Sequence, residues 1–302
     1  MSWQGNVLNR VLRRTMKPMM FSSRPTRARM GISAWALEAS ATLMPVPAIK
    51  ITPSRGLLRG EWLEALDTEQ ESRRVVLYLH GGAYIAGSAR THRPLTAELA
   101  RSSGARVLAL DYRQAPDHAW PAWLDDALGA YQQLIKAGSR PQDIVLAGDS
   151  AGGNLVLVTL LRLRELGLPM PAGAICLSPW TDLACGYQSH RLNASDEAML
   201  KPDAIRKLGL HHIGKRDPKD PLISPAYADL SNLPPLMVHV GTKEILLDDS
   251  RAIRRNAKRA GVHLHYREWQ DMPHVFPLFH RILPEGRKAI SQMAVFIKDV
   301  TS

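Results

Sequence analysis

Short apolar runs alternate with longer helical patterns along most of this chain, and that alternation limits the folds it can adopt. The apolar runs have the length of buried strands and lie at residues 75–80, 107–112, 144–148, 174–177 and 236–240. Helical patterns of a dozen or more residues lie among them, at 122–136, 151–166 and 246–260. Strands that alternate with helices predict a largely parallel sheet with helices on both faces, which is an α/β fold.

Two stretches depart from this alternation. Residues 49–66 contain two short extended segments around a turn at 53–56, which predicts an antiparallel pair of strands. Residues 181–232 are rich in polar residues and proline and contain no clear strand. We expect them to form an insertion that, with the N-terminal segment, makes a cap over the carboxyl ends of the strands. Met19, Met20 and Phe21 are candidates either to line the space beneath this cap or to serve as core or hinge.

A glycine-rich turn joins the third apolar run to the helix that follows it. The turn reads Gly148-Asp149-Ser150-Ala151-Gly152. This Gly-x-Ser-x-Gly pattern lifts a serine hydroxyl above the sheet on a strained strand-to-helix turn. Similar turns also join strands to helices for structural reasons alone, or bind phosphates. The choice between these interpretations depends on whether the chain also contains the other parts of a serine hydrolase in the right order. If it does, Ser150 is the nucleophile.

A second glycine-rich segment supplies candidates for an oxyanion hole. His80-Gly81-Gly82-Ala83 follows the first apolar run directly, and its small residues allow a substrate carbonyl to approach the backbone. The alternative is a glycine turn with no partner. We expect the N–H groups of Gly82 and Ala83 to act with that of Ala151, which opens a helix and has the helix dipole behind it.

A general base is expected in the loop after the last strand, predicted at 262–269. Of the eleven histidines, only His274 lies in that loop. His211 and His212 are adjacent, but no third ligand at a recognisable spacing accompanies them. We interpret them as surface or cap residues, and no metal site is predicted.

The acid that orients the base is expected after the strand at 236–240. Glu244 falls in the turn, whereas Asp248 and Asp249 fall inside the next helix. A side chain in the turn reaches the histidine from the edge of the sheet, so we favour Glu244 over Asp248. The chain order nucleophile, acid, base is then that of the α/β-hydrolase fold.

Several motifs in one order give the chain a resemblance to a known family. They lie at residues 80–84, 111–118, 148–153, 178–183 and 244–249 and in the loop of His274. Over residues 72–298 the chain resembles the hormone-sensitive-lipase-like branch of the α/β hydrolases, which includes the bacterial family IV esterases. Ala83 stands where a third glycine is commonest, and Glu244 where aspartate is usual.

The resemblance implies an eight-stranded, mostly parallel sheet with helices on both faces and a helical cap. It implies a cap segment at 1–45 and a hydrolase domain at 46–302, with a cap insertion at about 183–230. It also implies hydrolysis of small to medium-chain carboxylic esters by Ser150, Glu244 and His274, without a metal or cofactor.

Basic residues are concentrated near the N-terminus. The formal net charge is +11, and residues 1–30 contain no acidic residue. Their basic residues are Arg10, Arg13, Arg14, Lys17, Arg24, Arg27 and Arg29. Val7, Leu8, Val11 and Leu12 have the spacing of an amphipathic helix. Such a helix would either lie on an anionic membrane surface or pack on the protein with its basic face in solvent.

The sequence also bears on the compartment of the protein. No uncharged apolar run approaches the ~18 residues that span a bilayer, and residues 21–31 contain arginine, proline and serine that interrupt any signal-peptide core. The only two cysteines are Cys176 and Cys185, so a disulfide framework is not expected. These features predict a cytoplasmic protein without a transmembrane segment.

Other functions remain open at this stage. A lactone is an internal ester, so a lactone hydrolase is the alternative enzyme. A non-catalytic ligand-binding protein on the same fold is the alternative outside enzymes; the plant gibberellin receptors resemble this family but have lost the catalytic histidine, whereas His274 is retained here. No nucleic-acid partner is expected, because the basic run lacks aromatic interleaving and a recognisable binding motif. The sequence leaves open whether two subunits pair through residues 262–269 as a homodimer.

Overall fold

The computed structural model describes residues 2–19, 46–66 and 72–301. Most of the expected cap segment at 1–45 lies outside these residues, including Met20, Phe21 and the side chain of Met19. None of the helices in the described ranges combines the length and the hydropathy that a membrane crossing requires.

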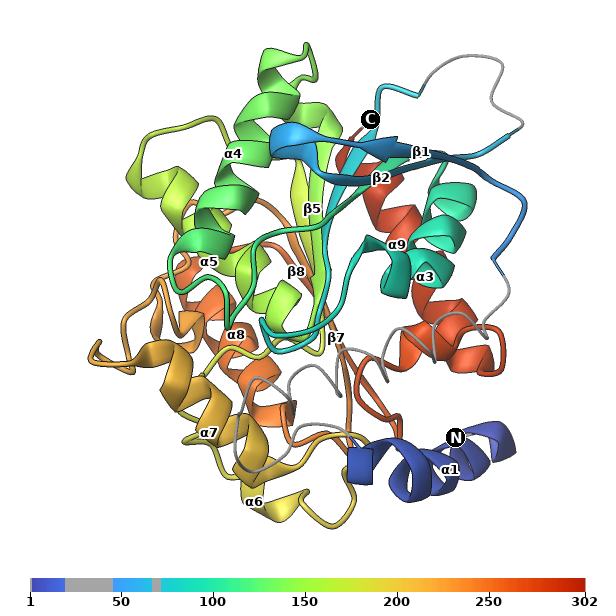
Figure 1. Ribbon diagram of the computed structural model, residues 1–302, viewed down its shortest axis with the longest axis vertical. Coiled ribbons are helices and arrows are strands. Elements are labelled where there is room, and N and C mark those ends of the chain that lie inside the picture. The colour runs from blue at the N-terminus through green and yellow to red at the C-terminus, as the bar shows by residue number, and fades with distance from the viewer. Residues whose placement is uncertain (1, 20–45, 67–71, 302) are drawn as a thin grey trace.

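Eight strands form one sheet in the order β1-β2-β4-β3-β5-β6-β7-β8 (Figure 1). Their bounds are β1 Lys50–Ser54, β2 Gly60–Glu64, β3 Val75–Leu79, β4 Arg106–Leu110, β5 Ile144–Asp149, β6 Gly173–Leu177, β7 Leu236–Gly241 and β8 Leu264–Trp269. The pairs β1–β2 and β2–β4 are antiparallel, and all other neighbouring pairs are parallel. The predicted eight-stranded, mostly parallel α/β fold is confirmed, with β8 at one edge of the sheet.

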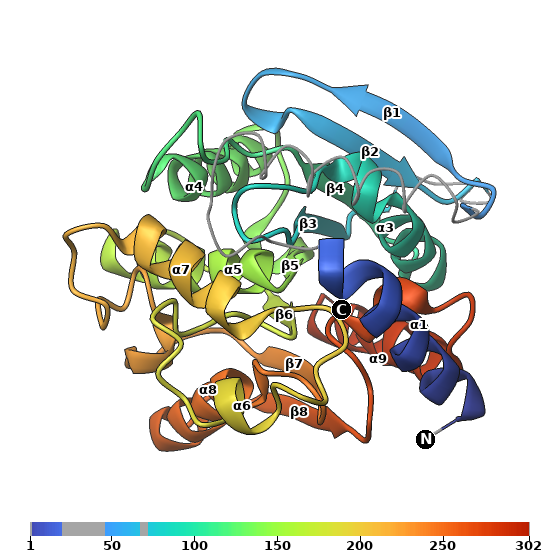
Figure 2. The same ribbon diagram turned by 60° about the horizontal axis from the view of Figure 1, so that its bottom comes forward.

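Helices cover both faces of the sheet, and others lie across its carboxyl edge. The bounds are α1 Trp3–Met19, α3 Ala89–Ser103, α4 Ala122–Lys136, α5 Ala151–Glu165, α6 Ser189–Leu192, α7 Pro202–Ile213, α8 Leu247–Ala260 and α9 Pro284–Val300. α3 and α9 pack on one face, and α4, α5 and α8 on the other (Figure 1). α1, α6 and α7 lie together at the end of the molecule where the parallel strands finish, which comes forward in Figure 2.

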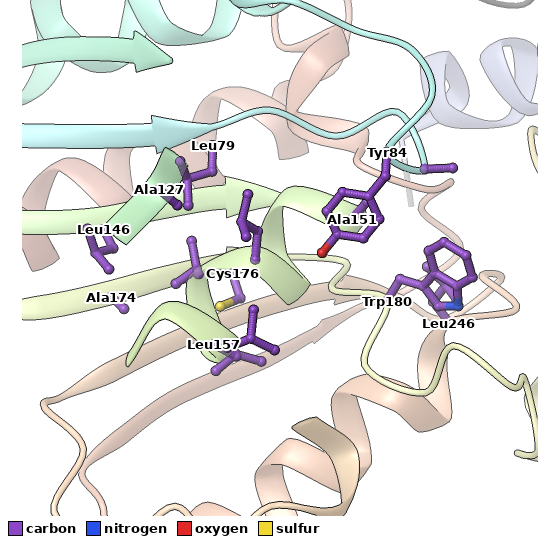
Figure 3. Close-up of a cluster of buried hydrophobic side chains, with 14 of the residues drawn as sticks. Leu79, Tyr84, Ala127, Leu146, Ala151, Leu157, Ala174, Cys176, Trp180 and Leu246 are labelled. Atoms are coloured by element: carbon purple, nitrogen blue, oxygen red, sulfur yellow. The ribbon is translucent and has the colours of Figure 1, made fainter. Parts of the chain in front are cut away.

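The central strands are buried on both faces, and this explains why their sequences are unbroken apolar runs. In β3, Leu77 and Leu79 pack in the hydrophobic cluster that includes Leu157 of α5. Val76 and Tyr78 of the same strand belong to the second cluster, on the face of α3 and α9. Figure 3 shows side chains of the first cluster, among them Leu79, Leu146 and Leu157.

Two elements differ from the sequence-based prediction. α3 was not predicted, because Pro94 interrupts its pattern; the helix nevertheless begins with a capping box between Ser88 and Thr91. The turn expected at 53–56 lies later, because Pro53 and Ser54 are still in β1 and the chain turns through a short 3-10 helix at Gly56–Leu58. The boundaries predicted for the parallel strands agree with the structure to within two residues.

Candidate active site

Ser150 lies on a strained turn between β5 and α5. Its backbone has φ 53° and ψ −120°, a conformation that costs a non-glycine residue about 1–3 kcal/mol. Two backbone hydrogen bonds fix the turn: the Ser150 N–H donates to the Leu177 carbonyl at 2.8 Å, and the Trp180 N–H donates to the Ser150 carbonyl at 3.0 Å. The turn is thereby attached to the neighbouring strand β6, and its serine is held at the carboxyl edge of the sheet.

The glycines around Ser150 allow close contact with strand β3. A Cβ atom on Gly152 would lie 1.9 Å from the Leu79 carbonyl oxygen, and one on Gly148 would lie 2.6 Å from the same atom. Real Cβ atoms do not approach an oxygen that closely, so the first turn of α5 can sit against β3 only with glycine at both positions. The Gly-x-Ser-x-Gly pattern thus has a steric cause in this structure.

Asp149 connects the turn to the segment that follows β3. Its carboxylate accepts hydrogen bonds from the Gly81 N–H at 3.0 Å and from the Tyr78 hydroxyl at 2.8 Å, and it lies 3.3 Å from Nε2 of His92. Burial alone would raise the pKa of Asp149, but the charge and hydrogen bond of His92 lower it below its usual range. The sequence predicted Asp149 only as part of the motif; its partner His92 was missed because α3 was missed.

The segment with Gly82 and Ala83 has a strained backbone. Gly82 has φ 119°, and a Cβ atom there would lie 2.0 Å from the Ala86 carbonyl oxygen. Ala83 and Tyr84 also have positive φ, at 54° and 61°. Among the described residues, the N–H groups of Gly82, Ala83 and Ala151 donate no hydrogen bond. Within the described residues, these donors have no partner and can serve a ligand.

Three contacts hold this strained loop in place. The Tyr84 hydroxyl donates to Oδ1 of Asn154 in α5 at 2.6 Å, and the Ala115 N–H donates to the Tyr84 carbonyl at 2.8 Å. Nε2 of His212, in α7, donates to the Ala83 carbonyl at 2.9 Å. Burial lowers the pKa of His212 to about 4, so its imidazole is neutral near pH 7. His212 is thus a buried residue of the inserted segment, whereas its neighbour His211 is exposed.

His274 and Glu244 meet at the carboxyl edge of the sheet, in the loops after β8 and β7. Nδ1 of His274 lies 2.8 Å from Oε2 of Glu244, and both side chains are buried. The two loops cross closely, since a Cβ atom on Gly241 would lie 2.0 Å from the Met272 carbonyl oxygen. Burial alone would lower the pKa of His274, but the hydrogen bond and charge of Glu244 raise it above 6.5. Glu244 thus stabilises the protonated imidazole.

The other acidic candidates point elsewhere. Oδ2 of Asp248 accepts a hydrogen bond from the Ser189 N–H at 2.9 Å, and Asp249 lies 3.0 Å from Nε2 of His190. Of the three carboxylates that the sequence placed after β7, the structure brings only Glu244 to His274.

Ser178 fixes the carboxylate of Glu244. Its hydroxyl donates to Oε1 of Glu244 at 2.7 Å and accepts a hydrogen bond from the Val275 N–H at 3.1 Å. The Gly241 N–H donates to the same carboxylate oxygen at 2.5 Å. Ser178 had been predicted only as part of a motif, and no spacing signal in the sequence connects it with residues nearly seventy positions away.

The described residues contain no group of three histidine, cysteine or acidic side chains arranged to hold a metal ion. At the carboxyl edge of the sheet, these residues include Ser150 on its strained turn and the buried pair of His274 and Glu244.

The family model described as alpha/beta hydrolase fold matches residues 76–278. The chain belongs to the alpha/beta hydrolase family. This hydrolase is 41% identical over 266 residues to an acetyl-hydrolase of Streptomyces hygroscopicus, with 88% of this chain and 87% of that protein covered. It is 38% identical over 252 residues to an esterase of Acinetobacter venetianus, with 83% and 82% covered.

Solved structures agree with this membership. An esterase of the bacterial hormone-sensitive lipase family has a TM-score of 0.91 and 38% identity, and the match covers 100% of this chain and 99% of that one. EstE5, from a crystal soaked with p-nitrophenyl butyrate, has a TM-score of 0.91 and 37% identity, with the same coverage. The predicted resemblance to the hormone-sensitive-lipase-like branch is confirmed, and the protein is a carboxylic ester hydrolase.

Proposed function

We propose that this hydrolase cleaves small to medium-chain carboxylic esters through an acyl-enzyme formed on Ser150. The observation that supports it most is the buried hydrogen bond between His274 and Glu244, 2.8 Å long, at the same sheet edge as the strained serine turn. A carboxylate in this position holds the imidazole with its proton on Nδ1, which leaves Nε2 as the base.

In the first step, Nε2 of His274 accepts the proton of the Ser150 hydroxyl as the oxygen attacks the ester carbonyl. The carbonyl oxygen becomes an oxyanion, and the N–H groups of Gly82, Ala83 and Ala151 donate hydrogen bonds to it. The imidazolium then protonates the leaving alcohol as the ester C–O bond breaks. Ser150 is left as an acyl ester.

In the second step, His274 takes a proton from water, which attacks the acyl carbonyl. The tetrahedral oxyanion forms again at the same N–H groups. When it collapses, the proton returns to the Ser150 oxygen and the carboxylic acid leaves. The acyl group is thus transferred to water, and all three side chains regain their starting protonation states.

Hydrolysis of p-nitrophenyl butyrate tests this assignment. We expect Ser150→Ala to lower kcat by about 10⁴-fold or more, because no other group can form the acyl-enzyme. Ser291→Ala, at an exposed position of α9, is the matched control and should retain wild-type turnover. Unchanged turnover in Ser150→Ala, with the protein folded, would refute the proposal.

A panel of substrates then addresses the natural ester. Rates on p-nitrophenyl esters of increasing acyl length, compared with rates on lactones of increasing ring size, separate a linear-ester hydrolase from a lactone hydrolase. We expect the linear esters of short and medium length to give the higher kcat/KM. Higher kcat/KM on lactones would mean that the natural substrate is a lactone. The proposed roles of Ser150 and His274 would be the same.

A further inference from the structure

Helix α1 has two faces, and only one of them is explained by packing. Leu8 and Leu12 are buried, and Nδ2 of Asn9 donates a hydrogen bond to the Asp271 carbonyl at 2.9 Å. The opposite face carries Trp3, which is 72% exposed, and Val7, which is 50% exposed. Val11, one further turn along, is 48% exposed and completes the row on this face.

Such a row is unusual on a surface helix. The outward face of an amphipathic helix is normally polar, because exposed apolar side chains gain nothing from water. Here Trp3, Val7 and Val11 recur at every fourth position, so they form a continuous apolar row rather than scattered exposed residues. We call this row, together with Arg10 and Arg14 on the same side of the helix, the outer face of α1.

Basic side chains accompany the apolar row. A groove of about 350 Å³ beside it is lined by Asn6, Asn9, Arg10, Arg13, Arg14 and Lys243. Arg13 lies 3.4 Å from Asp196, and Lys243 lies 3.3 Å from Asp271. Within the part of the chain that the structure describes, neither Arg10 nor Arg14 has an acidic partner. As far as the described ranges are concerned, two arginines are therefore available to an anion at this groove.

We propose that the outer face of α1 binds the surface of an anionic phospholipid bilayer. Trp3, Val7 and Val11 would enter the boundary between headgroups and acyl chains, where an amphipathic helix lies parallel to the membrane. Arg10 and Arg14 would contact lipid phosphates at the groove, and their side chains are long enough to reach headgroups while the helix backbone lies deeper.

The charges favour a bilayer over two other partners. Pairing of two copies through α1 would bring Arg10 and Arg14 close to the same arginines of the second copy, and these like charges would repel. A nucleic acid would satisfy the arginines but would leave the row of Trp3, Val7 and Val11 without apolar contacts. A bilayer with anionic headgroups complements both parts of the face.

The position of α1 gives this binding a consequence for access to the active site. Asn9 holds the helix to the loop of His274, three residues before it. Nζ of Lys17 donates to the carbonyls of Ala194 and Glu197 at 3.0 and 2.7 Å. Because α1 lies at the carboxyl edge of the sheet (Figure 2), a bilayer bound to its outer face would lie beside the edge that carries the candidate active site.

Flotation of the full chain with vesicles tests the proposal. One set of vesicles contains phosphatidylcholine alone, and the other contains phosphatidylcholine mixed with phosphatidylglycerol. We expect stronger partitioning into the second set, and weaker partitioning as salt is added. Arg10→Glu combined with Arg14→Glu should lower the partition coefficient by at least about tenfold. Trp3→Ser combined with Val7→Ser and Val11→Ser should lower it by a similar factor.

The matched control makes the same kinds of change on α9, at the exposed residues Lys288, Val295 and Lys298. Lys288→Glu combined with Val295→Ser and Lys298→Glu should keep the partition coefficient within about twofold of wild type. Turnover of dissolved p-nitrophenyl butyrate should be unchanged in every one of these variants, which shows that they are folded. Ser150→Ala should still bind, so vesicle binding is measured independently of ester hydrolysis.

Four results would overturn the proposal. The first is equal partitioning of the wild type into both sets of vesicles. The second is unchanged partitioning in the Arg10 and Arg14 variant. The third is calorimetric binding of inorganic phosphate at the groove with no vesicle binding. The fourth is a dimer, seen by sedimentation, that the α1 substitutions dissociate and that does not bind vesicles.

Discussion

The described residues contain three buried pairs of a carboxylate and a histidine. Two of these pairs, His274–Glu244 and His92–Asp149, differ in what the second ring nitrogen does. In the first pair, Nδ1 of His274 lies 2.8 Å from Glu244, and no other hydrogen bond to this ring is found among the described residues. In the second pair, Nε2 of His92 lies 3.3 Å from Asp149, and Nδ1 lies 2.8 Å from Oγ1 of Thr91.

The difference indicates what each pair can do. His274 has one ring nitrogen left to exchange a proton with a serine, a water or a leaving group. His92 has both nitrogens engaged, and its partner Asp149 also accepts hydrogen bonds from Tyr78 and Gly81. This difference supports our proposal that His274 and Glu244, the open pair, are catalytic, and it suggests that His92 and Asp149, the closed pair, position the serine turn.

The largest expected effect comes from removing the histidine of the first pair. His274→Asn should lower kcat on p-nitrophenyl butyrate by about 10⁴-fold or more, because the nucleophile loses its base. The midpoint of thermal unfolding should change less than in a variant that removes His92. Burial raises the pKa of Glu244, so this carboxylate can take up a proton once its partner is lost, whereas the pKa of Asp149 is lowered. A variant that unfolds at a much lower temperature but retains turnover would reverse our assignment of the two pairs.

Removal of the charge from Glu244 should have the next largest effect. Glu244→Gln should lower kcat by roughly 10³- to 10⁴-fold, because the amide no longer holds the imidazole in the required tautomer. Asp248→Asn is the control for the other candidate acid and should reduce kcat by less than about threefold. Steady-state rates on one ester are enough to measure both changes in kcat. A larger loss of kcat in Asp248→Asn than in Glu244→Gln would contradict the choice of Glu244 as the acid.

A substitution in the closed pair should affect stability more than turnover. His92→Asn leaves a buried carboxylate without its cationic partner, which should lower the free energy of unfolding by about 3 kcal/mol. Turnover of the folded variant should fall by only about tenfold, because the serine turn keeps its other hydrogen bonds. Urea unfolding and kcat are measured on the same preparation. Wild-type stability together with a loss of turnover like that of His274→Asn would show that His92 takes part in the chemistry.

The pH dependence should give the smallest effect. His274 must be neutral to act as a base, and contact with Glu244 raises its pKa above 6.5. We expect kcat/KM to fall as the pH drops through that raised pKa. In Glu244→Gln the residual kcat/KM should fall at a pH lower by about one unit or more. An acid limb that does not move in this variant would argue against His274 as the titrating base.

The sequence predicted the parts of this fold that leave a pattern in neighbouring residues. Strands buried on both faces need unbroken apolar runs, and the turn at Ser150 needs glycine at 148 and 152 because Leu79 lies so close. His274 was predicted from its place after the last strand. α3 was missed because a helix that contains Pro94 lacks a clear pattern, and the partner of Asp149 was missed with it.

Other features depend on contacts between distant residues. The choice between Glu244 and Asp248 depends on the direction of each side chain, and the hydrogen bond of Ser178 to Glu244 joins two separate loops. The sequence showed an amphipathic pattern in α1 but not which apolar residues would be covered. In the structure Leu8 and Leu12 are buried, whereas Val7 and Val11 remain exposed.

Covalent labelling with diethyl p-nitrophenyl phosphate tests the central assignment most directly, because this reagent phosphorylates an activated serine and leaves the product attached. Peptide mapping by mass spectrometry should find one diethylphosphoryl group, on Ser150, in the wild type and in His92→Asn. In His274→Asn the same reaction time should give almost no labelling. Equal labelling rates in wild type and His274→Asn, or a label on a different serine, would contradict the account.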